Sequence, residues 1–183
     1  MRVMLVCAAD KQTACMQFRA WEIGRMDEIR DQIEAIQRET ERHAFSSFSQ
    51  ADALRVGKTL LGLAEGEGLC VAVGVDLGEQ VSFRAALPGT SADYQHWIER
   101  KFATVRRFAK ASMQLELQAR LEPDFGTERA LDPSRYVLCG GAVPICVGST
   151  MVGAIGCAGL ASIDDHRLVI RAIETYRKAI DGS

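Results

Sequence analysis

Long apolar runs are missing from this chain of 183 residues. No run approaches the roughly 20 consecutive apolar residues that a membrane-spanning helix needs. The apolar stretch near the N-terminus, Val3 to Ala9, is short for the core of a signal peptide and is followed at once by Asp10 and Lys11. We therefore expect a soluble, cytoplasmic protein that has no membrane partner.

The sequence also lacks an excess of charge of one sign. Its 22 lysines and arginines stand against 24 aspartates and glutamates, which leaves a formal net charge of −2. A domain that binds nucleic acid usually carries a marked basic excess, because the phosphate backbone supplies much of the affinity. We therefore expect no nucleic acid among the partners.

Cysteine motifs typical of metal sites are absent as well. The six cysteines form no Cys-x-x-Cys pair, and their spacings match no zinc motif. Cys70, Cys146 and Cys157 lie inside apolar runs, where a thiol behaves as a small buried hydrophobic group. We expect reduced, structural cysteines and no metal site.

Recognisable catalytic motifs are equally scarce. The triplet at 57–59, Gly-Lys-Thr, resembles the end of a phosphate-binding loop, but Asp52 stands where that loop needs its first glycine and the triplet falls within a predicted helix. No Gly-x-Ser-x-Gly elbow occurs, and no motif places a histidine beside a serine or cysteine. Cys139 is the one thiol that merits a test as a nucleophile. The sequence leaves open whether the protein is an enzyme.

A regular pattern begins only at Met26. From there Ile29, Ile33 and Ile36 recur at helical spacing, whereas residues 1–25 show no clear period and no strong helix cap. We expect one compact domain at 26–183, with residues 1–25 as an N-terminal extension outside it.

Within 26–183, helical periods alternate with apolar runs joined by tight turns. The turns at 78–79 and 148–149 each join two neighbouring strands, which implies antiparallel hairpins. We therefore expect an α+β fold with an antiparallel sheet of about five strands and helices packed on it. The predicted helices are 26–42, 49–66, 90–113 and 162–180; the predicted strands are 43–49, 69–77, 80–87, 136–147 and 150–160; a long surface loop is predicted at 120–135.

Local signals fix several ends of these elements. Ser49 with Asp52, and Ser162 with Asp165, have the spacing of capping boxes at helix starts. Pro144 lacks an N–H group, so it indicates the start of a strand or an edge strand. Glycines at 153, 156 and 159 allow another part of the molecule, or a ligand, to approach the last strand closely.

Three segments resemble one protein family. They are ALPGTSADYQHWIERK at 86–101, GGAVPICV with MVGAIGCAGL between 140 and 160, and DDHRLVIRAI at 164–173. Together they are similar to the GlcG/HbpS-like group, often labelled haem-degrading domain proteins, and the resemblance runs from about Asp27 to the C-terminus. It implies a profilin-like or GlcG-like fold, homo-oligomers, and haem or another tetrapyrrole as the bound group. The chain departs from the family pattern at Tyr94, where Asn is common, at Ala158, where Ser is usual, and at 161–164, where Ala-Ser-Ile-Asp replaces Pro-Gln with acidic residues.

The most specific of these segments contains one group of candidate ligand-binding residues. Haem capture requires an axial ligand, apolar walls and cations for the propionates. His96, Trp97, Arg100 and Lys101 supply these types within six positions, although on a helix 96 and 100 share one face while 97 and 101 share the next. The alternative stays open that Trp97 packs in the core while His96, Arg100 and Lys101 are solvated.

A second group of candidates comes from the other two segments. His166 lies at a predicted helix start, where free N–H groups favour an anion and the imidazole can serve as ligand or acid. Gly140 and Gly141 can form an amide nest for a carboxylate or phosphate, or simply permit a turn with positive φ. Thr90 completes the candidate ligand-binding set, and His43 is the third histidine.

Two functions follow. The first is a ligand-binding domain for haem, a similar tetrapyrrole or another small anion, with haem degradation as a further activity. The second is a non-enzymatic homo-oligomeric scaffold that recruits a protein partner. Its contact surfaces would be the loop at 120–135 and the basic residues of one helix, Arg100, Arg106, Arg107 and Lys110.

Overall fold

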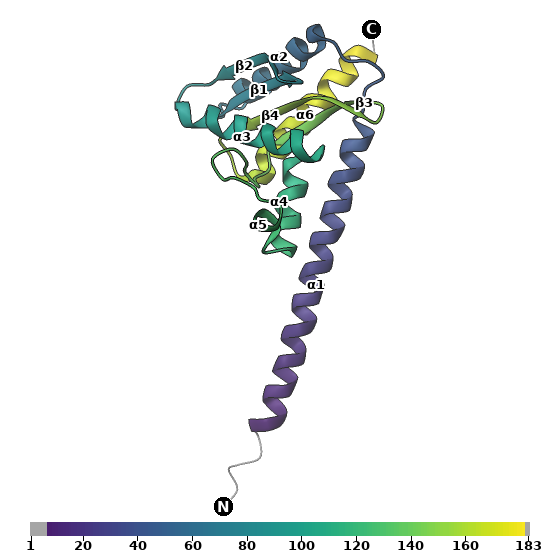
Figure 1. Cartoon of the computed structure of the whole chain (residues 1–183), viewed down its shortest axis with the longest axis vertical. Coiled ribbons are helices and arrows are strands. Elements are labelled where there is room, and N and C mark those ends of the chain that lie inside the picture. Colours follow the sequence, from purple (N-terminus) through teal and green to yellow (C-terminus); the bar gives the residue numbers. More distant parts are fainter. Residues whose placement is uncertain (1–6, 182–183) are drawn as a thin grey trace, which may run out of the picture.

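The computed structural model describes the backbone of residues 7–181 and the side chains of residues 23–180 (Figure 1). Within the described residues, no helix is long and apolar enough to cross a membrane. The helices are α1 (Cys7–Arg42), α2 (Gln50–Gly66), α3 (Ala92–Phe108), α4 (Ser112–Leu121), α5 (Phe125–Glu128) and α6 (Ser162–Asp181), and the strands are β1 (Ala72–Leu77), β2 (Gln80–Ala86), β3 (Ala142–Val147) and β4 (Thr150–Ala158).

The four strands form one antiparallel sheet in the order β2-β1-β4-β3. Helices α2 and α6 cover one face, where Val73, Val75 and Ile155 contribute to the larger core. Helix α3 covers the other face, where Ala72 and Ala154 pack against Phe102 in a smaller core. The predicted α+β class with an antiparallel sheet is confirmed (Figure 1).

The predicted fifth strand, 43–49, is wrong. This segment makes only an isolated bridge, in which the Phe45 N–H donates to the Cys146 carbonyl at 2.8 Å and the Phe45 carbonyl accepts from the Gly148 N–H at 3.0 Å. Only residues 43–49 connect α1 to α2, and Ser49 serves as the N-cap of α2. Too few residues therefore remain between the two helices to pair as a full strand. Phe45 is buried and Phe48 packs beside it with ring centroids 4.8 Å apart, so both contribute to the core as predicted.

The long helix predicted to continue to Met113 is also wrong. Helix α3 ends at Phe108, Ala109 adopts a left-handed conformation with φ of 50°, and α4 begins at Ser112. The two helices serve different cores, since Val105 lies on the α3 face of the sheet and Met113 packs in the opposite, larger core. A straight helix cannot reach both, and the break at Ala109 redirects the chain.

The predicted loop at 120–135 begins within α4 and contains the short helix α5. The Phe125 side chain is buried there and its ring lies 5.8 Å from that of Phe108. This segment is therefore tied to the end of α3 instead of lying free on the surface.

Helix α1 crosses residue 25 without a break and extends well beyond the body of the protein (Figure 1). Its C-terminal half packs on the larger core through Ile29, Ile33 and Ile36, as their spacing predicted. The predicted boundary between residues 1–25 and a domain at 26–183 stays a prediction, and residues 1–6 lie outside the described part.

Two of the predicted local signals are confirmed. The Ser49–Asp52 capping box starts α2, and Pro144 lies in β3, an edge strand of the sheet. The capping box predicted for Ser162 and Asp165 is wrong, because the Asp165 carboxylate accepts from the backbone N–H of Leu160 at 3.1 Å instead. Along α6 the predicted apolar face is buried through Tyr176, but Ile180 is exposed.

The carboxylate of Asp52 links the start of α2 to α6. It accepts hydrogen bonds from the Ser49 N–H at 2.7 Å, from the Tyr176 hydroxyl at 2.5 Å and from Arg55. Burial alone would raise the pKa of Asp52, but these hydrogen bonds outweigh it and hold the pKa well below its usual range.

We therefore expect Asp52→Asn to destabilise the protein at pH 7 and to matter less in acid. A carboxyl group whose pKa is lowered on folding stabilises the protein above its unfolded pKa of about 3.9, and that stabilisation is lost as the pH falls through the folded value. Urea unfolding of wild type and variant at pH 7 and pH 3 measures the difference. An equal difference at both pH values would contradict this assignment.

Candidate functional site

A cavity of about 360 Å³ opens between the start of α3, the end of β4 and the start of α6. We name it the Tyr94–Trp97 cavity. Its volume falls within the usual range for small-molecule sites. Its lining residues are Asp93, Tyr94, Trp97, Lys101, Cys139, Ala158, Gly159, Leu160, Ser162 and Asp165.

The floor of this cavity is a buried ion pair. The Lys101 Nζ donates to Asp165 Oδ2 at 2.8 Å and to the Cys157 carbonyl at 3.0 Å. The side chains of Lys101 and Asp165 are only 4% and 2% exposed. An ammonium group has three N–H bonds, so one remains for a ligand that enters the cavity.

Asp165 is the centre of a wider buried network. Its Oδ1 accepts from the Leu160 N–H at 3.1 Å and from the Cys157 Sγ at 3.4 Å. Burial raises the pKa of Asp165, and the positive charge of Lys101 opposes that rise. Burial also raises the pKa of the Cys157 thiol well above its usual value, and the neighbouring carboxylate adds to the rise. Cys157 is therefore a neutral thiol at physiological pH, which disfavours it as a nucleophile.

Glycines allow this network to form at close range. Gly141 has φ of +115°, and a Cβ placed on it would lie 2.7 Å from both Lys101 Nζ and Asp165 Cβ. Gly159 exposes backbone at the cavity edge, where the Tyr94 ring packs against it. The expected positive φ is confirmed at Gly141 but not at Gly140, whose N–H donates to the Glu116 carboxylate at 2.8 Å. The carboxylate held by that amide thus belongs to the chain itself.

Aromatic and small apolar groups form the walls. The Trp97 Nε1 donates to Asp93 Oδ2 at 2.9 Å, which fixes the indole, and the Arg100 guanidinium lies 4.8 Å from the centre of the Trp97 ring. Tyr94 and Ala158, two of the positions where the sequence departs from the family it resembles, both line this cavity, and Ser162 from the third departure at 161–164 lines it too. The departures therefore change residues that line the site.

The predicted quartet on α3 is divided between two places. Trp97 and Lys101 line the cavity, whereas His96 and Arg100 line a separate hollow of about 450 Å³ beside Arg106. This is the division that helical spacing predicted. The His96 side chain is 71% exposed and lies 3.5 Å from the Glu99 carboxylate. The alternative that Lys101 is solvated is wrong, because it is buried in an ion pair.

The remaining candidates lie outside the cavity lining. The buried His166 pairs through Nε2 with Glu39 Oε2 of α1 at 3.1 Å, and its Nδ1 is buried without a hydrogen-bond partner. That hydrogen bond lowers the pKa of Glu39. The Thr90 hydroxyl donates to the Leu87 carbonyl at 2.7 Å and so closes the turn before α3. Half-buried His43 lies 3.8 Å from Glu174, and burial lowers the pKa of its imidazole.

The structure thus assigns to Asp165 a part in the site that the sequence did not reveal. The local pattern placed it in a capping box, and 64 residues separate it from Lys101. The usable signal was that both residues fall in the segments shared with one family. Among the described residues, no three His, Cys, Asp or Glu side chains gather as a metal site would require, and the four described cysteines are free thiols.

Comparison with known proteins gives consistent matches. Residues 48–174 match the model of a family described as haem-degrading protein HbpS-like. A UPF0303 protein of Brucella canis is 36% identical over 152 residues, which cover 82% of this chain and 90% of that protein.

Two solved structures are similar in fold. The crystal structure of the Ybr137w protein superposes with a TM-score of 0.74 at 21% identity, covering 81% of this chain and 89% of that one. A structure described as a PduOC:heme complex has a TM-score of 0.60 at 17% identity, covering 70% of this chain and 94% of that one.

Proposed function

The chain belongs to the HbpS-like haem-degrading family, and from this premise we propose that it binds haem or a related tetrapyrrole at the Tyr94–Trp97 cavity. The observation that carries the proposal is the pairing of aromatic walls with a buried cation at the floor, where Lys101 keeps one N–H bond for a ligand. The similarity in fold to a PduOC:heme complex supports the same class of ligand.

The lining residues fit the chemical parts of such a ligand. Tyr94 and Trp97 offer flat apolar surfaces to a macrocycle, and Lys101 offers a donor to one of its carboxylates. The Arg100 guanidinium, 4.8 Å from the centre of the Trp97 ring, supports the indole but itself lines the separate hollow beside His96. Tyrosine and cysteine both serve as haem ligands in proteins, so Tyr94 and Cys139 are the lining residues suited to the iron.

When bound, haem would supply an iron centre for redox or oxygen chemistry. The side chains around the cavity would hold and orient the ligand and would exclude water from it. Asp165 holds Lys101 in place through their ion pair, and Asp93 holds the Trp97 indole in place. We confine the proposal to binding. The scaffold alternative has no supporting observation, and we do not propose it.

We expect a haemin titration of the purified protein to give a saturable Soret shift. Trp97→Ala should weaken binding about tenfold, which corresponds to about 1.4 kcal/mol, because it removes one wall of the cavity. His96→Ala is the matched control on the neighbouring position of α3, and it should bind haemin as the wild type does. Tyr94→Phe should shift the position of the Soret band if the phenolate binds the iron. Circular dichroism confirms that each variant is folded.

Two outcomes would contradict the proposal in different ways. A wild type without a saturable shift would reject the ligand class. A saturable shift that His96→Ala abolishes and Trp97→Ala leaves unchanged would move the site to the hollow around Arg100. Light scattering on the same samples tests the predicted homo-oligomer.

A further inference from the structure

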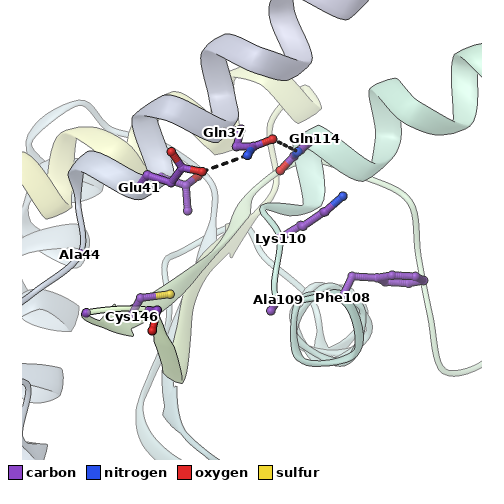
Figure 2. A pocket seen from close by; sticks show the side chains of 11 residues that line it. Gln37, Glu41, Ala44, Phe108, Ala109, Lys110, Gln114 and Cys146 are labelled. Atoms are coloured by element: carbon purple, nitrogen blue, oxygen red, sulfur yellow. Dashed lines mark hydrogen bonds between the residues drawn. The ribbon is translucent and has the colours of Figure 1, made fainter.

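A second hollow, of about 540 Å³, lies where α1 passes over the α3–α4 junction and the turn between β3 and β4 (Figure 2). It shares no lining residue with the Tyr94–Trp97 cavity. Its lining residues are Gln37, Thr40, Glu41, Ala44, Phe108, Ala109, Lys110, Gln114, Cys146, Gly148 and Ser149.

Two side chains of opposite charge, Glu41 and Lys110, line this hollow and form no ion pair with each other. Glu41 lies on α1, whereas Lys110 lies between α3 and α4, on a different wall (Figure 2). They form no ion pair with each other, and neither forms one with any other residue in the described part of the chain. Lys110 is half-buried, so part of its side chain packs on the protein while its ammonium group has no ion-pair partner among the described residues.

The carboxylate of Glu41 is held in place by a short chain of amides. The Gln114 side chain, only 2% exposed, donates to Gln37 Oε1 at 3.4 Å, and the Gln37 Nε2 donates to Glu41 Oε1 at 2.9 Å (Figure 2). The first bond joins α4 to α1 and the second runs along α1, so together they orient the exposed Glu41 carboxylate. An ionised carboxylate has about four lone-pair sites, so Glu41 keeps the capacity to accept hydrogen bonds from a ligand.

Apolar groups also line this hollow. Ala44, Phe108 and Cys146 are among them. Burial raises the pKa of the Cys146 thiol, which is therefore neutral and acts as part of an apolar wall. Ala109 turns the chain in a left-handed conformation that is uncommon for a residue with a side chain, and this turn delivers Lys110 to the hollow.

We propose that this hollow binds a small zwitterion with a short apolar body, of the type of a free amino acid. Lys110 receives the carboxylate, Glu41 receives the ammonium group, and the apolar lining residues contact the body of the ligand. Opposite charges on separate walls favour a molecule that carries both complements over a simple anion or cation. Because α1 forms one wall, the bound zwitterion also ties α1 to the body of the protein.

The test uses L-leucine as the probe, with 4-methylpentanoate and isopentylamine as matched molecules that each lack one of its charges. Saturation-transfer NMR on the full chain should detect leucine at millimolar concentration and find the two half-ligands at least about tenfold weaker. Lys110→Met and Glu41→Gln should each weaken leucine binding about tenfold, the equivalent of one lost charged contact. Lys58→Met, an exposed lysine on α2 outside the hollow, should leave it unchanged.

The inference is overturned if leucine gives no saturable signal, or if both variants bind it as the wild type does. Binding of 4-methylpentanoate as tightly as leucine, with no effect of Glu41→Gln, would also overturn it in favour of a plain anion site. Haemin binding should be unaffected by Lys110→Met, which separates failure of this inference from failure of the proposed function.

Discussion

Lys101→Met is expected to lower the free energy of unfolding by about 3–5 kcal/mol, the cost of leaving one member of a buried ion pair without its partner. The Asp165 carboxylate would keep its hydrogen bonds from Leu160 and Cys157 but lose the only cation in contact with it among the described residues. For a chain of this length the melting temperature should fall by roughly 6–20 °C. Thermal unfolding followed by circular dichroism measures it.

Two comparisons isolate the charge from the loss of packing. Lys110→Met removes a half-buried lysine that has no ion-pair partner in the described structure and should change stability far less. The double variant Lys101→Met with Asp165→Asn should be more stable than Lys101→Met alone, since no charge is then left buried. The cost of Lys101→Met should also shrink as the pH falls, because a carboxyl whose pKa is raised by burial becomes neutral and no longer needs a cation. A double variant less stable than the single one would contradict this account.

The second large effect is expected for Gly141→Ala. The backbone conformation at φ of +115° is strained for any residue with a side chain, and the new methyl group would collide with Asp165, the Lys101 ammonium and the Cys157 carbonyl. Strain and overpacking together should cost about 3 kcal/mol or more. Denaturant unfolding gives this value, and haemin titration of the folded fraction reports whether the cavity floor survives.

Gly62→Ala provides the matched control. Gly62 lies in the middle of α2, and a Cβ added there would meet no other atom within 4 Å, so the same chemical change should stabilise the helix by up to about 1 kcal/mol. If Gly141→Ala and Gly62→Ala had similar effects, the close packing of Gly141 against the Lys101–Asp165 pair would not matter for folding.

Features that depend on neighbouring residues were predictable from the sequence. The capping box at Ser49, both hairpins, the edge position of Pro144 and the apolar face of α6 all rest on contacts within a few positions. The spacing along α3 also predicted correctly that His96 and Arg100 would share one face of the helix and that Trp97 and Lys101 would share the next.

Features that depend on distant contacts were not predictable in this way. The apolar period runs on past Ala109, so nothing local shows that Val105 and Met113 belong to different cores. In the same way, Asp165 has the spacing of a capping residue, and only the folded chain brings it to Lys101. Long-range pairing fixed the helix break and the floor of the cavity.

The contact between Glu39 and His166 is one of those that hold α1 in its position along the body. One turn of a helix is about 3.6 residues and 5.4 Å, so a shift by a turn in either direction would bring Ala35 or His43 to the place of Glu39. Neither residue could replace the Glu39 carboxylate as the partner of the buried His166 imidazole. The alanine side chain has no polar group, and a second histidine brings no negative charge. The Glu39–His166 pair therefore helps to fix the register of α1, a helix of 36 residues, against the body of the protein. A displacement of a few ångströms at this pair would also displace the part of α1 that projects beyond the body.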